Sequence, residues 1–449
     1  MLSKTLDLAS SSVGTASVSQ RILGANERVG VGFIGYGLIG AQHVRDFKNQ
    51  TDADLVALSD CYEPRLRQGV AACGPRAKGY SDFRRLLEDR NVQAVVVSTP
   101  DHWHALITML ACAAGKDVYV EKPMTLFVRE GRWMVKAAQR YHRIVQVGTQ
   151  QRSGAHYLRA RQLMNQGHIG KIHTARMGSF RNIMPGFGSP PDVPPPPGMN
   201  YDMWLGPAPK RPYNPHRSLY HFRWFWDYSG GQMTNLGAHE LDIVHWVMNL
   251  LGPQSASSDG GRFALTDDNG ETPDTQDALF AYPDFTVLWS HREASRGRGA
   301  GEGLEFFGTK GSLFITRSGF QVFPDQKVPP QNHIPQFSGM PVGGPTHVAD
   351  VTPVPWTEAI KEARSNDLLA AHARNFLDCV KSRREPIAPV EDGHRVATAC
   401  HLANISLRLG RKIKWDPEKE EIIDDAEASA WLERPYRAPW DREFRSLNL

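Results

Sequence analysis

The chain of 449 residues is longer than one ordinary hydrophobic core supports, so its length predicts two domains with additional tails. With 41% hydrophobic and 22% charged residues, the composition is typical of a globular protein. The formal net charge of +4 is spread along the chain without a basic stripe, and no run reaches the roughly 20 apolar residues of a membrane helix. Neither nucleic acid nor a membrane is therefore expected as a partner.

The first 28 residues contain small and polar side chains and lack the continuous apolar stretch of a secretory leader. They predict an N-terminal arm and a cytoplasmic protein. An exported or periplasmic protein, whose leader is missing from this start, is the alternative. The five cysteines form no CxxC pattern and are expected to be reduced thiols.

Residues 29–149 alternate between short β-branched runs and stretches with helical periodicity. This alternation predicts an α/β domain with a parallel sheet and right-handed crossovers, the Rossmann architecture. The expected strands are Val29–Ile34, Leu55–Leu58, Ala94–Ser98, Val118–Val120 and Val145–Val147. The expected helices are Tyr80–Asp89, Ala105–Ala114 and Glu130–Tyr141.

Residues 150–415 predict a second, α+β domain with a large, mostly antiparallel open sheet, because glycine turns rather than helices separate most of its strand-like runs. The Pro-rich loop 185–215 is expected to contain no regular structure. Residues 416–449 form a charged, then aromatic tail that is expected to fold back over a domain or a neighbouring chain. The expected strands are Lys171–Phe180, Ala278–Tyr282, Thr286–His291, Gly303–Gly308 and Gly311–Ile315, and the expected helices are Ala155–Gln166, Leu368–Ser382 and Gly393–Leu409.

A Gly-x-Gly-x-x-Gly motif at Gly35, Gly37 and Gly40 follows the first strand and opens a helix, which is the arrangement that holds a dinucleotide pyrophosphate. Asp60 ends the second strand at the spacing of a residue that binds the adenosine ribose hydroxyls. An acid there favours NAD and disfavours NADP, although Arg65 lies near enough to weaken this argument. Ser98, Thr99 and Pro100 end the fourth strand and are expected at the same crevice.

Several further motifs resemble those of the glucose–fructose oxidoreductase/inositol dehydrogenase/MocA (Gfo/Idh/MocA) family over roughly residues 29–415. They are Glu121-Lys122-Pro123 after the fifth strand, the segments Thr99–His104 and Gly148–Arg152, and Gly230-Gly231 followed by Asn235–Asp242. The resemblance implies the same two-domain fold, a nicotinamide cofactor, a cis Lys122-Pro123 peptide, and a homodimer or homotetramer that uses the open sheet.

The same resemblance and the chemistry of the residues identify Lys122 and His239 as catalytic candidates. A partly desolvated lysine and an imidazole are both suited to moving a hydroxyl proton while hydride leaves carbon. Family members commonly carry an aspartate where this chain has Asn235, which puts a plain alcohol dehydrogenase mechanism in doubt. Asp242 is expected either to orient His239 or to pack the helix.

The residues expected to contact the cofactor are Gly35, Gly37, Leu38, Ile39, Gly40, Asp60, Ser98, Thr99, Pro100, His102, His104, Glu121, Lys122 and Gln150. Those expected on the substrate side are Lys122, Trp103, Arg152, Tyr157, Asn182, Arg223, Trp226, Asn235 and His239. No metal is expected, since His239, Asp242 and His245 follow in three-residue steps that fan around a helix.

Three functional hypotheses follow. The first is hydride transfer between NAD and a secondary hydroxyl of a small-molecule sugar, polyol or glycoside. The second is a redox-neutral glycoside hydrolase, in which a tightly bound NAD oxidises a ring carbon transiently and is reduced and reoxidised in place. The third is a non-catalytic NAD-dependent sensor or scaffold, against which the presence of both Lys122 and His239 argues.

Overall fold

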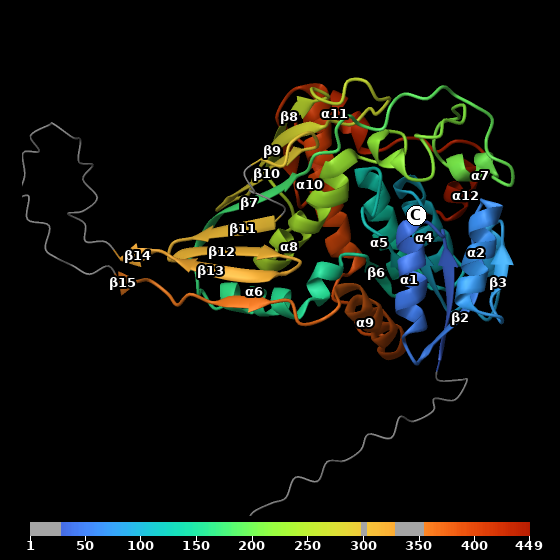
Figure 1. Ribbon diagram of the computed structural model, residues 1–449, viewed down its shortest axis with the longest axis horizontal. Coiled ribbons are helices and arrows are strands. Elements are labelled where there is room, and N and C mark those ends of the chain that lie inside the picture. Colours follow the sequence, from blue (N-terminus) through green and yellow to red (C-terminus); the bar gives the residue numbers. More distant parts are fainter. Residues whose placement is uncertain (1–27, 298–302, 328–353) are drawn as a thin grey trace, which may run out of the picture.

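The computed structural model describes residues 28–297, 303–327 and 354–449, and the N-terminal arm expected over residues 1–28 lies outside them except for Arg28. Two sheets dominate this part of the chain (Figure 1), one parallel and small, the other large and open. No helix within the described ranges is both long and apolar enough to cross a membrane.

The first domain is a six-stranded parallel sheet in the order β3-β2-β1-β4-β5-β6. All six residues of β1 are buried, because helices cover both faces of the sheet. The order reverses between β1 and β4, where the carboxyl ends of parallel strands leave a crevice. The strands are β1 (Val29–Ile34), β2 (Ala53–Ser59), β3 (Lys78–Tyr80), β4 (Ala94–Val97), β5 (Asp117–Val120) and β6 (Val145–Val147). The helices are α1 (Leu38–Lys48), α2 (Glu63–Cys73), α3 (Phe83–Glu88), α4 (Asp101–Ala113) and α5 (Val128–Arg140). This confirms the predicted Rossmann architecture.

The second domain contains a ten-stranded sheet in the order β16-β13-β12-β11-β7-β10-β9-β8-β17-β18. Its pairs are antiparallel except for β7 and β10, which run parallel. One face is buried, as the alternating burial of β9 and β10 shows. The strands are β7 (Ile172–Phe180), β8 (Ser255–Gly261), β9 (Thr275–Ala281), β10 (Thr286–Arg292), β11 (Gly303–Gly308), β12 (Gly311–Thr316), β13 (Gly319–Pro324), β16 (Lys361–Ala363), β17 (Ile413–Asp416) and β18 (Glu421–Ile422). The two-residue strands β14 (Gln326–Lys327) and β15 (Val354–Pro355) pair separately.

The helices of this domain cover the buried face of the large sheet and also reach the Rossmann domain. Helix α10 lies between the two sheets (Figure 1) and packs against α5, α8 and β8. The helices are α6 (Ala155–Asn165), α8 (Ala238–Met248), α9 (Leu368–Ser382) and α10 (Val390–Leu409), with the 3₁₀ turns η2 (Gln150–Ser153) and η3 (His221–Trp224) and a π-helical turn, η4 (Met233–Gly237).

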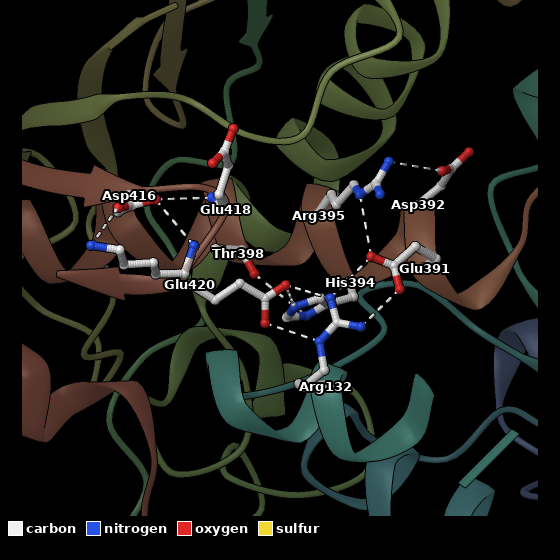
Figure 2. A network of polar contacts seen from close by, with 10 residues as sticks. Arg132, Glu391, Asp392, His394, Arg395, Thr398, Asp416, Glu418 and Glu420 are labelled. Carbon is white, nitrogen blue, oxygen red and sulfur yellow. Dashed lines mark hydrogen bonds and ion pairs between the residues drawn. The ribbon is translucent and has the colours of Figure 1, made fainter. Parts of the chain in front are cut away.

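A network of ion pairs fastens the N-terminal half of α10 to the first domain (Figure 2). Arg132 of α5 donates to both carboxylate oxygens of Glu391, at 2.8 and 3.0 Å, and to Glu420 in the turn between β17 and β18. The buried His394 completes the network through its 3.0 Å contact with Glu420. The two domains are therefore held together by shared charges as well as by apolar packing.

The Pro-rich loop is mostly irregular, but the expectation that it contains no regular structure is wrong for one short stretch. Residues Tyr201–Leu205 form α7, whose N-cap Asn200 accepts a hydrogen bond from the backbone of Met203. This stretch carries no proline, so nothing removes its backbone donors. The loop lies over the Rossmann domain beside α2 and α4 (Figure 1).

The C-terminal tail packs back over the Rossmann domain. Trp440, at the start of α12 (Trp440–Ser446), is 3% exposed and contacts Trp103 of α4 and Phe83 of α3. Arg437 donates to the backbone oxygens of Gly206 and Ala208 at 3.0 and 3.1 Å. The tail, which also forms the short helix α11 (Ala426–Ser429), thereby holds the Pro-rich loop against α4.

Replacing Trp440 by alanine should remove this anchor. We expect Trp440→Ala to lower the free energy of unfolding by about 3–5 kcal/mol, because a large buried side chain leaves a cavity. Urea denaturation measures this loss, and Arg445→Ala, which changes a side chain that is 73% exposed on the same helix, is the control. Equal stabilities of the two variants would contradict a structural role for the tail.

Candidate functional site

The glycine motif forms the turn between β1 and α1. Gly35 has a φ of +93°, and a Cβ there would lie 2.8 Å from the backbone oxygen of Ser98. A Cβ on Gly40 would lie 2.2 Å from the oxygen of Gly35, so the helix packs closely on the turn. At Gly37 nothing lies closer than 3.8 Å, which leaves the start of α1 open to a ligand.

A cavity of about 360 Å³ begins at this turn and follows the carboxyl ends of β1, β2 and β4. Its size and its open helix N-terminus fit a dinucleotide. Eight of the residues expected at the cofactor line it: Gly35, Gly37, Leu38, Ile39, Asp60, Ser98, Thr99 and Pro100. The buried hydroxyl of Thr99 has no hydrogen-bond partner within the described residues and is available to a ligand.

Asp60 is held in the cavity wall by two backbone amides. Its oxygens accept hydrogen bonds of 2.8 Å each from the N–H groups of Tyr36 and Tyr62. Burial raises the pKa of Asp60, and these two amides and Arg65 oppose that rise. Each oxygen keeps a further lone pair, so Asp60 is suited to accept hydrogen bonds from ribose hydroxyls.

Lys122 lies in the loop after β5, next to a cis Lys122-Pro123 peptide. Its ammonium donates two hydrogen bonds, both of 2.9 Å, to the backbone oxygen and to the side-chain Oδ1 of Asn235 in the second domain. Burial lowers the pKa of Lys122 to about 8, and the neighbouring Glu121 carboxylate limits that fall. Lys122 is therefore a cation that can release its proton close to neutral pH.

The amide of Asn235 is oriented by a chain of hydrogen bonds that ends on a buried carboxylate. Asn235 Nδ2 donates to Gln232 Oε1 at 3.0 Å, and Gln232 Nε2 donates to Glu293 Oε1 at 2.7 Å. Glu293, 1% exposed, also accepts from Trp224 Nε1 at 2.7 Å and from Arg181. Because a carboxylate only accepts, Gln232 must turn its NH₂ group to Glu293 and its oxygen to Asn235. Asn235 then donates through its own NH₂ group, which leaves its oxygen facing Lys122.

His239 stands in the first turn of α8, directly after the π-helical turn that contains Asn235. Its side chain is buried, and its Nδ1 has no hydrogen-bond partner in the part of the chain that the structure describes. Burial lowers the pKa of His239 well below its usual value, and the positive charges of Lys122 and Arg317 lower it further. His239 is therefore a neutral imidazole, and no group among the described residues engages its Nδ1.

Asp242 and Arg152 pair with each other instead of facing His239 or a substrate. Arg152, 1% exposed, donates through Nε to both oxygens of Asp242 at 2.9 and 3.1 Å. Its Nη1 donates to Asp392 at 2.6 Å. These contacts use the arginine to join α8 with α10, so we remove both residues from the proposed catalytic and substrate-binding groups.

Six residues expected at the cofactor do not line the cavity: Gly40, His102, His104, Glu121, Lys122 and Gln150. His102 contacts the Trp204 backbone oxygen at 3.0 Å, and His104 lies between the backbone oxygens of Thr99 and Pro123. Glu121 contacts His43 of α1 at 2.7 Å. The two histidines and Glu121 thus brace the loops that form the site, while a direct cofactor contact by Gln150 stays a prediction.

The residues expected on the substrate side divide into two groups. Trp103 and Arg223 line the dinucleotide cavity, and Arg223 also lies near Lys122 and Asp101. Trp226 packs against Arg408, whose guanidinium carbon is 4.7 Å from the ring centre, and therefore has no free face for a sugar on that side. Tyr157 is buried and accepts from Gln151, and the exposed Asn182 accepts from the backbone of Met184, so neither lines the cavity.

Sequence reasoning did not identify which side chains of the covering loop line the cavity. Met203, Trp204, Leu219, Tyr220 and Phe222 line its outer side. The aromatic content of the loop was the one signal in the sequence that could have identified them. Contacts between residues distant in sequence decide which of these side chains face inwards.

The cover is fastened to the adenosine side of the Rossmann domain. Glu63 N donates to Gly198 O and Asn200 N donates to Cys61 O, both at 2.8 Å. On α4, Trp103 Nε1 donates to the backbone oxygens of Met203 and Trp204 at 3.1 and 3.0 Å. The segment that covers the cavity is thus attached at two places.

Sequence reasoning also missed Arg317, in the turn after β12, and Asp101, at the start of α4. Their charges act on Lys122, and that of Arg317 also acts on His239. Arg317 belongs to no recognisable motif, and Asp101 lies within the segment Thr99–His104 but was not singled out there. Among the described residues, no group of three or more His, Cys, Asp or Glu side chains has a geometry that would hold a metal ion.

Comparisons with known proteins agree with this geometry. Residues 29–149 match the family model described as "Oxidoreductase family, NAD-binding Rossmann fold". Residues 185–257 and 358–442 match the model for the C-terminal alpha/beta domain of the same oxidoreductases. Both the dinucleotide cavity and the second domain are therefore recognised as parts of one family.

Among curated relatives, the myo-inositol 2-dehydrogenase of Thermotoga maritima is 25% identical over 88% of this chain and 99% of its own. Two solved structures show the same fold. The aldose–aldose oxidoreductase of Caulobacter crescentus has a TM-score of 0.63 at 18% identity, over 86% of this chain and 99% of its own. The WlbA dehydrogenase of Bordetella pertussis was solved with NADH and UDP-GlcNAcA. It has a TM-score of 0.62 at 19% identity, over 87% of this chain and 99% of its own.

The position of Asp60 leads to a test of cofactor choice. Asp60→Ala should weaken NAD binding about tenfold or more and reduce the preference for NAD over NADP, because the carboxylate no longer accepts from the ribose or repels a 2′-phosphate. Titrating both dinucleotides into the protein measures this. Asp54→Ala removes a carboxylate from β2, the strand that leads to Asp60, where Asp54 pairs with Arg76, and is the matched control. Unchanged selectivity in Asp60→Ala would contradict the assignment.

Proposed function

We propose, from the premise that this chain belongs to the Gfo/Idh/MocA family of NAD-binding oxidoreductases, that it transfers hydride between NAD and a secondary hydroxyl of a small polyol or sugar. The observation that carries the proposal is the pair of Lys122 and His239. One is a partly buried cation and the other a neutral imidazole with an unpartnered nitrogen, and the lysine charge acts on the imidazole.

The two side chains divide the work on the hydroxyl proton. NAD supplies the hydride acceptor when it is bound. His239 is unprotonated at neutral pH because of its lowered pKa, so it can accept the proton of the substrate hydroxyl. Lys122 is still protonated below about pH 8 and can donate a hydrogen bond to the same oxygen as negative charge develops on it. In the reverse direction His239 returns the proton.

Asn235 sets the charge of this arrangement. As an amide it holds Lys122 through two oxygens without adding a negative charge. A carboxylate at this position would favour the charged forms of both Lys122 and His239 and would raise both pKa values. The amide therefore supports a protonated lysine beside a neutral histidine, and the difference from other family members changes the pKa values rather than removing the chemistry.

A substrate panel tests the proposal. The purified protein is incubated with myo-inositol, free sugars and aryl glycosides while NADH absorbance and aryl release are followed. We expect net NADH with a polyol or sugar, and a loss of about 100-fold or more in kcat for His239→Ala and for Lys122→Met, with NAD binding retained. His173→Ala, on an exposed part of β7, should behave as the wild type. Full activity in both site variants would refute their roles.

The redox-neutral glycoside hydrolase is the second candidate, and the fastened cover favours it. The segment 198–223 covers part of the dinucleotide cavity and is hydrogen-bonded to the β2–α2 loop and to Trp103, an arrangement that would slow the release of a bound dinucleotide. A retained NAD would serve a reaction that returns the hydride to the same substrate. In the panel this reaction gives aryl release without net NADH, and denatured protein releases NAD.

The third candidate is a sensor or scaffold. It predicts that the panel yields neither NADH nor a released aryl group. It also predicts that Lys122→Ala leaves ligand binding unchanged. A homodimer or homotetramer also stays a prediction, as does a cytoplasmic location.

The hydrogen-bonded chain behind Asn235 gives a pH test of this mechanism. In the wild type, kcat/KM for oxidation should fall as pH rises through about 8, because Lys122 loses the proton that it donates to the substrate oxygen. Gln232→Met frees the Asn235 amide to turn its NH₂ towards Lys122. An NH₂ group facing the ammonium disfavours the protonated form of Lys122 and lowers its pKa. The fall of kcat/KM should therefore move to lower pH.

The control for this test is Gln162→Met, an exposed glutamine on α6. It should reproduce the wild-type pH profile. A rise of kcat/KM through pH 8 in the wild type would instead make Lys122 the base, and an unshifted limb in Gln232→Met would show that the chain does not act on Lys122.

A further inference from the structure

A second polar cavity, of about 200 Å³, lies outside the dinucleotide cavity, where α6, the end of α8 and the start of α10 meet. Three arginine side chains line it: Arg152 of η2, Arg161 of α6 and Arg395 of α10. None of the mechanism described above uses Arg161 or Arg395. The cavity is therefore a separate feature that needs its own explanation.

Arg161 is the guanidinium without a carboxylate partner. It forms no ion pair with any of the described residues, and its buried Nε has no hydrogen-bond partner among them. It lies against Trp246, with 4.5 Å between the guanidinium carbon and the ring centre. Burial and the charge of Arg152 lower the pKa of Arg161, while Asp392 opposes this. A partly buried arginine in this position is stabilised by an anion.

His245 provides a second unpartnered donor at the same cavity. It is 4% exposed, and its Nε2 contacts the hydroxyl of the buried Tyr282 at 2.8 Å. Its Nδ1 is buried without a partner within the described ranges. Burial and the charges of Arg152 and Arg395 lower the pKa of His245 to about 3, so the ring is neutral. When the tyrosine donates to Nε2, Nδ1 carries the proton and can donate to an acceptor in the cavity.

The carboxylates near the cavity leave Arg161 without an ion pair among the described residues. Arg395 pairs with Glu391 at 3.3 Å and lies 4.0 Å from Asp392 (Figure 2), Asp392 is engaged by Arg152 at 2.6 Å, and Glu385 is exposed. The first turn of α10, a 20-residue helix whose N-cap is a proline without a side-chain cap, adds free backbone N–H groups.

We propose that this cavity binds a phosphate group, either free or as a small monoester. A tetrahedral anion accepts from several directions at once, which suits two guanidinium groups, the imidazole N–H and a helix N-terminus. The ligand takes Arg161 as its main ion-pair partner and Arg395 as the second. Through Arg152, which joins the cavity wall to Asp242 on α8, the bound anion stabilises the helix that carries His239.

The test is calorimetric titration of inorganic phosphate, and separately of glycerol 3-phosphate, into the NAD-saturated protein at constant ionic strength. Saturation with NAD keeps the probes out of the pyrophosphate site. We expect one phosphate site per chain, and Arg161→Gln should weaken it about tenfold or more, because a charge-assisted contact is lost. Binding of the inorganic ion alone identifies free phosphate as the ligand, and binding of both probes identifies a site that accepts monoesters.

The matched control is Arg159→Gln, which removes the same charge from an exposed position on the same helix, where Arg159 contacts only Gln162 in the described structure. It should bind phosphate as the wild type does. Should Arg161→Gln not fold, Arg395→Gln replaces it with the same expected weakening. The proposal is overturned if neither probe binds, if Arg161→Gln binds as tightly as the wild type, or if Arg159→Gln loses as much affinity.

Discussion

The contact between Lys122 and Asn235 is the constraint on which the site depends, because it joins a loop of the Rossmann domain to the second domain across a buried interface. A partly buried ammonium needs acceptors, and one residue, Asn235, provides two of them. The π-helical turn that contains Asn235 places both its backbone and its side-chain oxygen on the same nitrogen, and it leads directly into the helix that carries His239. Moving the domains apart would leave this charge without partners.

The remaining interdomain contacts preserve that arrangement. Arg152 joins α8 to α10, Arg132 joins α10 to α5, and the C-terminal tail holds the cavity cover against α4. All three contacts involve charged or aromatic groups that pair within the protein, so they hold the two domains at the distance that the Lys122–Asn235 contact needs.

Features encoded locally were predictable from sequence. The glycine turn, Asp60 and Lys122 each follow a strand whose hydrophobic run is visible, and parallel strands bring their carboxyl ends together. Strand β8, with the sequence SASSDGG, has no such run and forms by pairing with β9. The partners of Arg152 and Trp226 lie 90 and 182 residues away, at Asp242 and Arg408, so their spacing carried no signal. Both residues were therefore assigned to the substrate, although their partners are within the protein.

Burial explains why Lys122 and His239 can act together at neutral pH. Desolvation disfavours the charged form of both bases, and it lowers the pKa of Lys122 to about 8 but that of His239 well below its usual value. Glu121 limits the fall for the lysine, and the charge of the lysine increases the fall for the histidine. Between the two pKa values, Lys122 is a protonated donor and His239 is an unprotonated acceptor. A substrate hydroxyl requires both when it gives up its proton. A neutral Asn235 preserves this difference, since an acid in its place would favour the protonated form of both.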